Sequence, residues 1–138
     1  MNPLRVLWPM FALVTWTFVV LLRVPYKRLS AGCAGRVSAE DFKYGESARV
    51  PPDVLIPNRN LTSLLEVPVL LYAGCLTACL TRVVDAWTLA LAWAYVGLRV
   101  AHSLVHLSYN DVLHRLVVYA ASNLALGLLW LHLLVSLA

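Results

Sequence analysis

The sequence predicts an all-α membrane protein, an up-and-down bundle of four membrane-spanning helices. Hydrophobic residues make up 61% of its 138 positions, and charged residues only 13%. Soluble domains carry about 25% charged residues, so this deficit of charge excludes an ordinary soluble domain. The apolar residues form four runs, at about 7–24, 63–82, 86–107 and 112–137. Each run is long enough to cross the hydrocarbon core of a bilayer, which takes roughly 17–25 helical residues.

The first run, about 7–24, is interpreted as a retained membrane span and not as a cleaved signal peptide. Arg23, Lys27 and Arg28 stand at its end and directly after it. Such charges stop transfer, whereas the small-residue cleavage site of a signal peptide should follow the run closely. A proline disfavours the helical conformation in the residue before it, so this helix is expected to end at Pro25.

A polar segment, about 26–62, is predicted to form a loop between the first two spans. Pro51, Pro52 and Pro57 argue against a continuous helix through its later half, because an interior proline removes a backbone hydrogen bond. Within the loop, the stretch Ser38–Asp41 predicts the start of a short surface helix.

Short connections predict how the other spans pack. Val83–Asp85 joins the second span to the third, and Ser108–Asp111 joins the third to the fourth. Helices joined by so few residues pack as antiparallel neighbours. The chain is therefore expected to form one domain, residues 1–138, whose fourth span closes the bundle.

The distribution of Lys and Arg predicts the orientation in the membrane. The loop at 26–62 carries six of them, against Arg5 before the first span and Arg82 between the second and third. Because Lys and Arg concentrate in short cytoplasmic loops, this loop and the Ser108–Asp111 turn are expected to be cytoplasmic and both termini to lie opposite. The net charge of +4 therefore comes mostly from one loop and indicates the orientation in the membrane, and no nucleic-acid partner is expected.

Ionisable residues gather at the cytoplasmic end of the third span. Arg99, His102 and His106 stand at i, i+3 and i+7, which puts them on one helix face. Arg99 lies roughly 13 Å below the turn that follows. A charge in the hydrocarbon costs roughly 2.5–3.5 kcal/mol, so it usually faces a partner or a polar cavity. The two histidines lack a third ligand at useful spacing, and no metal site is predicted.

A second group opens the second span. Arg59, Ser63 and Glu66 stand at i, i+4 and i+7 and share one face. Glu66 is predicted to pair with Arg99, because the second and third spans are adjacent and antiparallel; the pair could serve packing alone or belong to a functional site. Arg115 opens the fourth span, as an interfacial anchor or as a member of the same site.

These residues together predict a site on one leaflet of a small bundle. Three arginines, one glutamate and two histidines suit a polyanionic, water-soluble ligand that is reached from the cytoplasm. The surrounding bilayer would supply an apolar co-substrate.

Three stretches resemble the MAPEG family, the membrane-associated proteins of eicosanoid and glutathione metabolism. Arg59–Tyr72 resembles the signature at the second helix of the family. Arg99-Val100-Ala101-His102, followed by Arg115 sixteen residues after Arg99, resembles the third-to-fourth helix signature. Leu22–Val24 through Gly35–Ser38 resembles the first helix and loop of bacterial members. The similarity covers nearly the whole chain.

The resemblance implies a homotrimer of four-helix bundles, with glutathione bound as co-substrate between neighbouring subunits at the cytoplasmic end. It implies that Arg59 and Glu66 hold glutathione, with Glu66 near the amino group. It also implies that Arg99 lines the pocket and that Arg115 lies nearest the sulfur. The chain departs from the family at Ser63, where asparagine is usual; many eukaryotic members also have tyrosine where this chain has His106.

Two functions from different classes follow from this resemblance. The first is a glutathione-dependent transferase or peroxidase that acts on an apolar electrophile or a lipid hydroperoxide. The alternative is a non-catalytic bundle of the same fold that binds an anionic lipid or a partner membrane protein. A proton or ion path through Glu66, His102 and His106 is disfavoured, because the outward half of the helices offers little polar continuation.

Arg115 has two possible roles in the enzyme. A thiol of pKa about 8.5 is mostly protonated at neutral pH, and the thiolate is the nucleophile. A guanidinium nearby would lower the pKa of that thiol and would stay charged throughout. Its planar fork could equally clamp a carboxylate.

Overall fold

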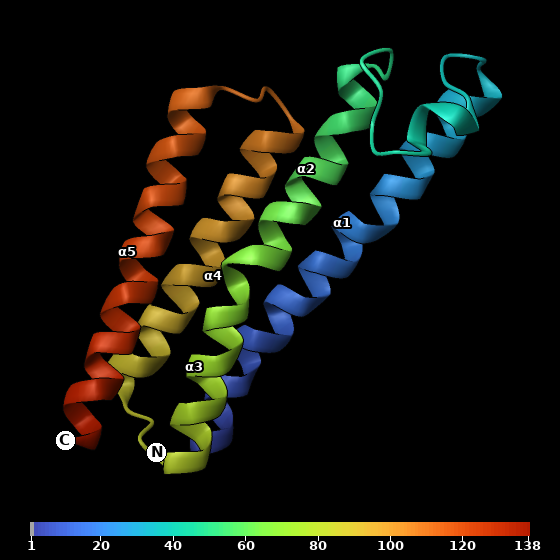
Figure 1. The fold of residues 1–138 in the computed structure, drawn as a ribbon. Helices are drawn as coiled ribbons and strands as arrows, with labels where there is room; N and C mark the ends of the chain where they lie inside the picture. The colour runs from blue at the N-terminus through green and yellow to red at the C-terminus, as the bar shows by residue number, and fades with distance from the viewer. Residues whose placement is uncertain (1) are drawn as a thin grey trace.

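The computed structural model describes residues 2–138, which fold into a bundle of long helices (Figure 1). Two short 3-10 helices are present, η1 (Pro3–Val6) and η2 (Ala39–Phe42). The α-helices are α1 (Leu7–Cys33), α2 (Pro52–Glu66), α3 (Pro68–Thr81), α4 (Ala86–Leu107) and α5 (Val112–Leu137).

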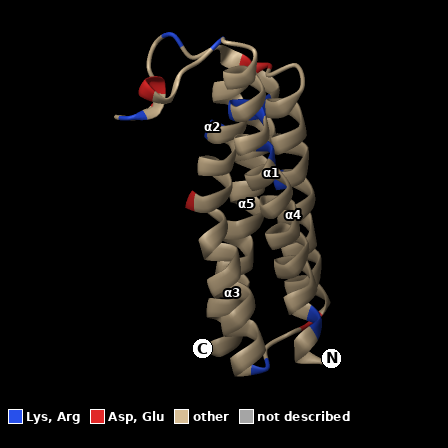
Figure 2. Ribbon diagram, turned by 90° about the vertical axis from the view of Figure 1, so that its right-hand side faces the viewer, with Lys and Arg blue, Asp and Glu red and all other residues tan. Residues whose placement is uncertain are grey.

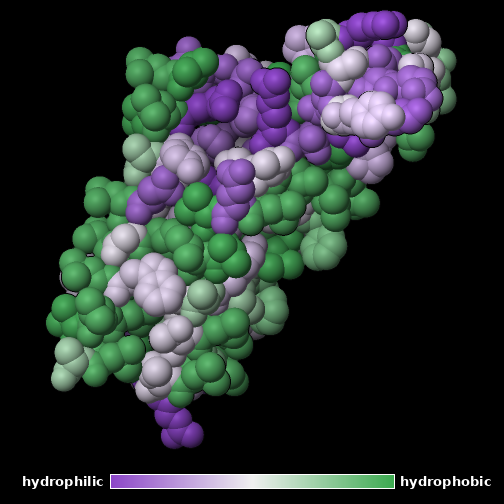
Figure 3. Space-filling view, viewed as in Figure 1, coloured by the Kyte–Doolittle hydropathy of each residue, from purple (hydrophilic) through white to green (hydrophobic). Residues whose placement is uncertain are grey.

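Four helical stretches are long and apolar enough to cross a membrane: Pro3–Cys33, Pro52–Thr81, Ala86–Leu107 and Val112–Leu137. The predicted fold class, an all-α bundle of four spans, is confirmed, and the chain is an integral multi-pass membrane protein. The outer surface below the polar end is mostly hydrophobic, with polar side chains scattered among the hydrophobic ones (Figure 3). This surface suits contact with lipid tails, which satisfy no polar group.

Helix α1 is longer than the sequence predicts, because it continues through Pro25 to Cys33. The expectation that the helix ends at Pro25 is therefore wrong. Ala31, in the extension, packs with Val50 and Val54 in a small satellite core. Tertiary contacts of this kind outweigh the local preference against a helix at a proline.

Helix α2 begins at Pro52, so the later half of the predicted loop at 26–62 is helical instead. Pro52 occupies the first helical turn, where a missing N–H removes no intrahelical bond. Asp53 accepts two hydrogen bonds from the guanidinium of Arg36, at 3.1 and 3.2 Å, which ties the helix start to the end of α1. The loop itself is confined to residues 34–51.

The second span is interrupted in its middle. Helices α2 and α3 meet at Val67, directly before Pro68. Pro68 has no N–H to donate to Leu64 and its ring crowds that carbonyl, which breaks the helix locally. Since the span begins at Pro52, Pro68 stands in the interior of the span and not in its first turns.

The predicted short surface helix at Ser38–Asp41 is confirmed as η2. In its capping box the Ser38 backbone N–H donates to Asp41 Oδ2 at 2.9 Å. Outside the capping box, the Ser47 hydroxyl donates to Asp41 Oδ1 at 2.7 Å. The Ser38 N–H, with the Ser47 hydroxyl, holds the pKa of Asp41 below its usual value. The loop is therefore a folded cap on the end of α1 and α2.

Helix α4 is central, with contacts to α1, α2, α3 and α5. Fully buried Leu13, Leu71, Tyr95 and Leu129 bring all four spans into one core. Small side chains such as Ala92 allow the close helix approach that membrane bundles use. The core therefore fixes α4 against the helices that carry the polar residues described below.

Both predicted short connections are present. Asp85 caps α4, accepting from the backbone N–H and the hydroxyl of Thr88 at 2.8 and 2.9 Å. His132 Nε2 lies 3.1 Å from both carboxylate oxygens of Asp85, a contact that joins α5 to the start of α4. The Oδ1 atom of Asn123 on α5 is buried without a hydrogen-bond partner within residues 2–138.

Candidate functional site

A cavity of about 420 Å³ opens at the loop end of the bundle, between α2, α4 and α5. A hydrophilic patch marks this end of the surface (Figure 3). Charged residues gather at the same end, with few along the shafts of the helices (Figure 2). The cavity therefore lies at the polar, charge-rich end of the bundle.

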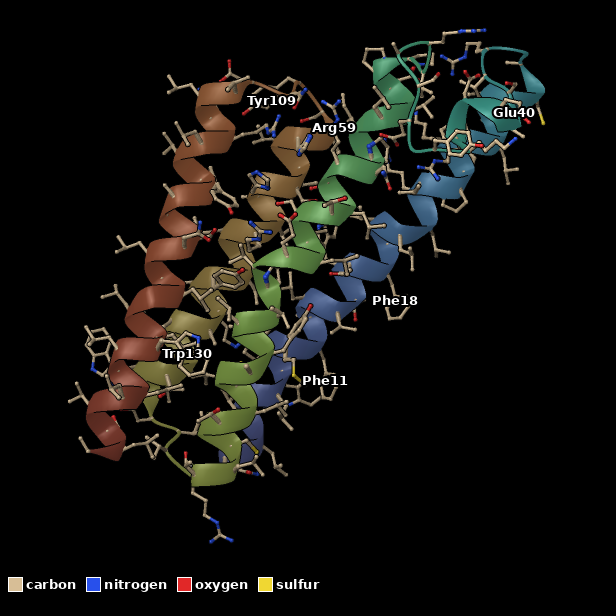
Figure 4. All side chains as sticks on the ribbon, in the orientation of Figure 1. Phe11, Phe18, Glu40, Arg59, Tyr109 and Trp130 are labelled. Atoms are coloured by element: carbon tan, nitrogen blue, oxygen red, sulfur yellow. The ribbon has the colours of Figure 1, made fainter. Side chains whose placement is uncertain are left out.

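The structure brings most of the predicted site residues together around this cavity. Arg59 and Ser63 line it from α2, His102 and His106 from α4, and Arg115 from α5. Arg59 lies midway along α2, on the side of the bundle where Tyr109 marks the α4–α5 turn (Figure 4). Ionic and neutral polar groups from three helices thus share one concave surface.

Arg99 lies behind the cavity wall and is fully buried. Its Nη2 donates to the backbone carbonyl oxygen of Ser63 and to the Ser63 hydroxyl, the latter at 3.2 Å. The centre of its guanidinium lies 5.3 Å from the ring centroid of Tyr119. Its Nε and Nη1 atoms have no hydrogen-bond partner among the described residues.

The predicted ion pair between Glu66 and Arg99 is wrong within this chain. Glu66 is exposed and lies outside the cavity lining. Glu66 points outward from a membrane span, where hydrocarbon desolvates a carboxylate as a buried apolar site does, so its partner is expected from outside the single chain. Ser63 and the π face of Tyr119 take the place of the carboxylate around the guanidinium.

His102 and His106 are nearly fully buried, with 4% of each exposed. Their ring centroids are 5.9 Å apart in an edge-to-face arrangement, and His102 lies 5.6 Å from the Tyr119 ring. The Nδ1 atom of each has no partner within residues 2–138. Both imidazoles thus offer unused hydrogen-bonding atoms beside the cavity. No cluster of three potential metal ligands occurs in the same described range.

Arg115 lies in the first turn of α5, half-buried at the cavity wall. Its Nη1 donates to Asn110 Oδ1 at 2.8 Å, and its Nε has no partner in the described chain. Asn110 adopts a left-handed backbone with φ 50°, and its N–H donates to the Val105 carbonyl at 2.8 Å. The turn therefore holds one edge of the guanidinium and leaves the other edge for a ligand.

Sequence reasoning missed Asn110 and Tyr119, both of which line the cavity. Asparagine adopts the left-handed conformation more readily than most residues, so its place in a four-residue turn was a usable signal. Tyr119 follows Arg115 by four residues, which puts both on one helix face.

Sequence reasoning also missed Asn60, which is fully buried next to the cavity wall. Its Nδ2 donates to the Ser103 hydroxyl, joining α2 to α4 directly behind the lining residues. This contact sets the register between the two helices. Ser103 lies 43 positions from Asn60 in the sequence, so no local pattern indicated the contact between them.

The cavity is suited to an anion. Arg59 and Arg115 face it, hydroxyls and imidazoles supply further hydrogen bonds, and no carboxylate is among its described lining residues. Arginine binds carboxylates and phosphates through two parallel hydrogen bonds.

Comparison with known families decides the assignment of the fold. The sequence model of the MAPEG family matches residues 6–135, nearly the whole chain. The chain belongs to the MAPEG family. The resemblance noted from Arg59–Tyr72 and the third-to-fourth helix signature is therefore confirmed. Membership makes this chain a membrane protein related to eicosanoid and glutathione metabolism. No curated protein and no solved structure matches it.

Proposed function

We propose that this MAPEG protein is a glutathione-dependent membrane transferase or peroxidase that acts on an apolar electrophile or a lipid hydroperoxide. One observation carries the proposal: Arg59 and Arg115, from two helices, face one cavity at the membrane edge. Glutathione carries two carboxylates and a thiol, and these are the groups that such a cavity can bind.

Arg59 and Ser63 are assigned to binding. Arg59 is exposed at the cavity, where its fork can take a carboxylate from solution. The Ser63 hydroxyl reaches less far than the asparagine usual at this position, but it still donates and accepts. Arg99 fixes Ser63 through its carbonyl and hydroxyl oxygens, so its part in binding is indirect.

Glu66 is assigned to the amino group of glutathione in an assembled homotrimer. It is exposed on the outside of the single chain. A neighbouring subunit packed over that face would turn an open side of the bundle into a shared pocket. His102 and His106 would then offer neutral imidazole nitrogens to the peptide groups of the ligand.

Arg115 is assigned to the thiol. Its guanidinium, with the backbone N–H groups at the start of α5, makes a positive field that favours a thiolate over a thiol. The thiolate would attack an electrophilic carbon of an apolar substrate that enters from the bilayer, so that a carbon–sulfur bond forms as the bond to the leaving group breaks and the leaving group departs with its electron pair. With a hydroperoxide, the sulfur would instead attack the terminal oxygen, so that the oxygen–oxygen bond breaks and the lipid leaves as an alcohol. The resulting sulfenic acid of glutathione would react with a second glutathione to give the disulfide and water.

The second candidate is a non-catalytic MAPEG bundle. It is favoured by Ser63 in place of asparagine and by the outward position of Glu66. In this reading Arg115 and Arg59 bind the phosphate of an anionic lipid or an acidic partner membrane protein.

Orientation is part of the proposal. The loop and the cavity lie at the same end, which carries most of the Lys and Arg residues (Figure 2). We infer that this end is cytoplasmic and that both termini face the other side.

Calorimetry of the detergent-solubilised protein with glutathione tests the proposal. Binding with release of a proton near neutral pH, in several buffers of different ionisation heat, supports the enzyme. An S-methyl analogue, which cannot ionise at sulfur, is the control and should bind without proton release. Absence of binding would favour the non-catalytic bundle.

A further inference from the structure

We propose that a groove between α1 and α4 binds a membrane lipid with an anionic headgroup. The groove has a volume of about 260 Å³ and lies near the loop end of the bundle. Trp16, Val20 and Arg23 line it from α1, and Leu104 and Leu107 from the last turns of α4. The lining is apolar except at the end where Arg23 stands.

This groove is separate from the cavity of the proposed reaction. The two share no lining residue. On α4, Leu104 is two positions from both His102 and His106, which is roughly 200° around the helix from each. The histidines face the cavity, so Leu104 faces the opposite side of the bundle. The lipid site therefore stands whether or not the protein binds glutathione.

The positive charge of Arg23 indicates that the ligand of the groove is anionic. Two other cations near it in the chain are neutralised internally, since Arg28 lies 3.1 Å from Glu46 and Arg36 lies 3.1 Å from Asp53. Arg23 is exposed on a membrane-spanning helix and has no ion pair or hydrogen bond among residues 2–138. Its anionic partner must come from outside the described chain.

The groove is charged at one end and apolar along its walls, which matches the charged headgroup and apolar acyl chains of a membrane lipid. Arg23 stands beside Ser108, where α4 has just ended. Trp16 lies two helical turns earlier on α1, roughly 10 Å deeper in the bundle. Between these two ends the walls are apolar, with Val20 from α1 and Leu104 from α4. A headgroup phosphate at Arg23 thus places an acyl chain along the wall towards Trp16.

Native mass spectrometry from vesicles of equal phosphatidylcholine and phosphatidylglycerol content tests the site. The wild-type chain is expected to retain phosphatidylglycerol at least tenfold over phosphatidylcholine. Arg23→Gln is expected to abolish this preference. Arg49→Gln is the matched control, because it removes the same charge from an exposed loop position outside the groove, and it should behave as wild type.

A second pair of variants tests the groove and not the charge. Leu104→Trp fills the apolar wall from a position that is 52% exposed, and it should displace the lipid although Arg23 remains. Leu124→Trp adds the same bulk on α5, outside the groove, and should leave the retained lipid unchanged.

Three results would overturn the proposal. If Arg23→Gln retains phosphatidylglycerol at the wild-type level, the charge of Arg23 does not bind the headgroup. Displacement of the lipid by equimolar inorganic phosphate means that the site takes a free anion and needs no acyl chain. If the wild-type chain retains no lipid and Leu104→Trp changes the oligomeric mass, the groove is a contact between subunits.

Discussion

Arg99 shows how a buried cation can be held without a carboxylate. Two oxygens of Ser63 and the ring of Tyr119 surround it, and two of its nitrogen atoms remain unpaired in the described chain. Glu66 was predicted as the partner of Arg99 on the basis of opposite charge. A sequence shows which residues are charged, but it does not show which backbone carbonyl oxygens the fold brings near them. The exposed carboxylate of Glu66 is thereby left for an external group.

Asn110 is expected to influence how strongly the charge of Arg115 favours a bound thiolate. Asn110→Asp places a negative charge at an atom now 2.8 Å from Arg115 Nη1. The carboxylate should weaken the positive field and raise the pKa of a bound thiol by roughly one unit, which is about a tenfold fall in its ionisation constant and a smaller thiolate fraction near neutral pH. Ultraviolet absorbance of the thiolate measures this.

The control is Asn110→Gly, which accepts the left-handed backbone at φ 50° and introduces no charge. It should retain most of the thiolate signal. Equal thiolate fractions in the aspartate variant and the wild type would show that Arg115 does not face the sulfur.

Asp85 is expected to give the bundle an acid-sensitive contact. The backbone N–H of Thr88, together with its hydroxyl and His132, holds the pKa of Asp85 below its usual 3.8. A lowered folded-state pKa means that the carboxylate stabilises the fold above about pH 4 and loses this effect as pH falls through the folded-state value.

The melting temperature of Asp85→Asn should therefore lie below that of the wild type at pH 6, with a difference that shrinks as pH falls towards 3. Glu40→Gln is the control, because the Glu40 side chain is 80% exposed, and it should match the wild type throughout. A difference for Asp85→Asn that is independent of pH would contradict the assignment.

At the scale of helices, the sequence predicted the existence and order of the spans better than their ends. The runs at 86–107 and 112–137 coincide with α4 and α5, because apolar length and the short turn between them are local properties. The end of α1 and the start of α2 were missed. Contacts between distant residues, such as Arg36 with Asp53, decide those boundaries.

The buried contact between Asn60 and Ser103 is expected to fix α2 against α4. Asn60→Ala or Ser103→Ala alone should lower the free energy of unfolding by about 1–3 kcal/mol, because each leaves a buried polar partner unsatisfied. The double variant should lose less than the sum, by roughly 1 kcal/mol. Denaturant unfolding in detergent measures all three.

Thr62→Ala is the control for this cycle, since Thr62 is exposed and bonds only to the Asn58 carbonyl within its own helix. It should change the free energy of unfolding by less than about 0.5 kcal/mol. Strictly additive losses for Asn60 and Ser103 would show that the hydrogen bond does not couple the two helices.

For the whole molecule, a homotrimer is expected. The single chain leaves Glu66 exposed on a membrane span and outside the cavity lining. Neighbouring subunits would supply the missing side of the pocket. Crosslinking and native mass should give three chains per particle, whereas a stable monomer with full glutathione affinity would contradict this assembly.

The site as a whole was only partly accessible from sequence. Helical spacing grouped Arg59 with Ser63 and His102 with His106, and the turn placed Arg115 near them. Spacing within a helix could not indicate which faces of different helices meet, so Asn60, Asn110 and Tyr119 were absent from the predicted set.

The thiolate absorbance of bound glutathione tests the central claim, that this cavity activates a thiol. The wild type is expected to show the ultraviolet band of a thiolate when glutathione is added near neutral pH. Arg115→Leu should lose the band while still binding, and Arg59→Leu should bind more weakly but keep the band in its bound form. A wild-type protein that binds no glutathione and shows no thiolate band would contradict the claim.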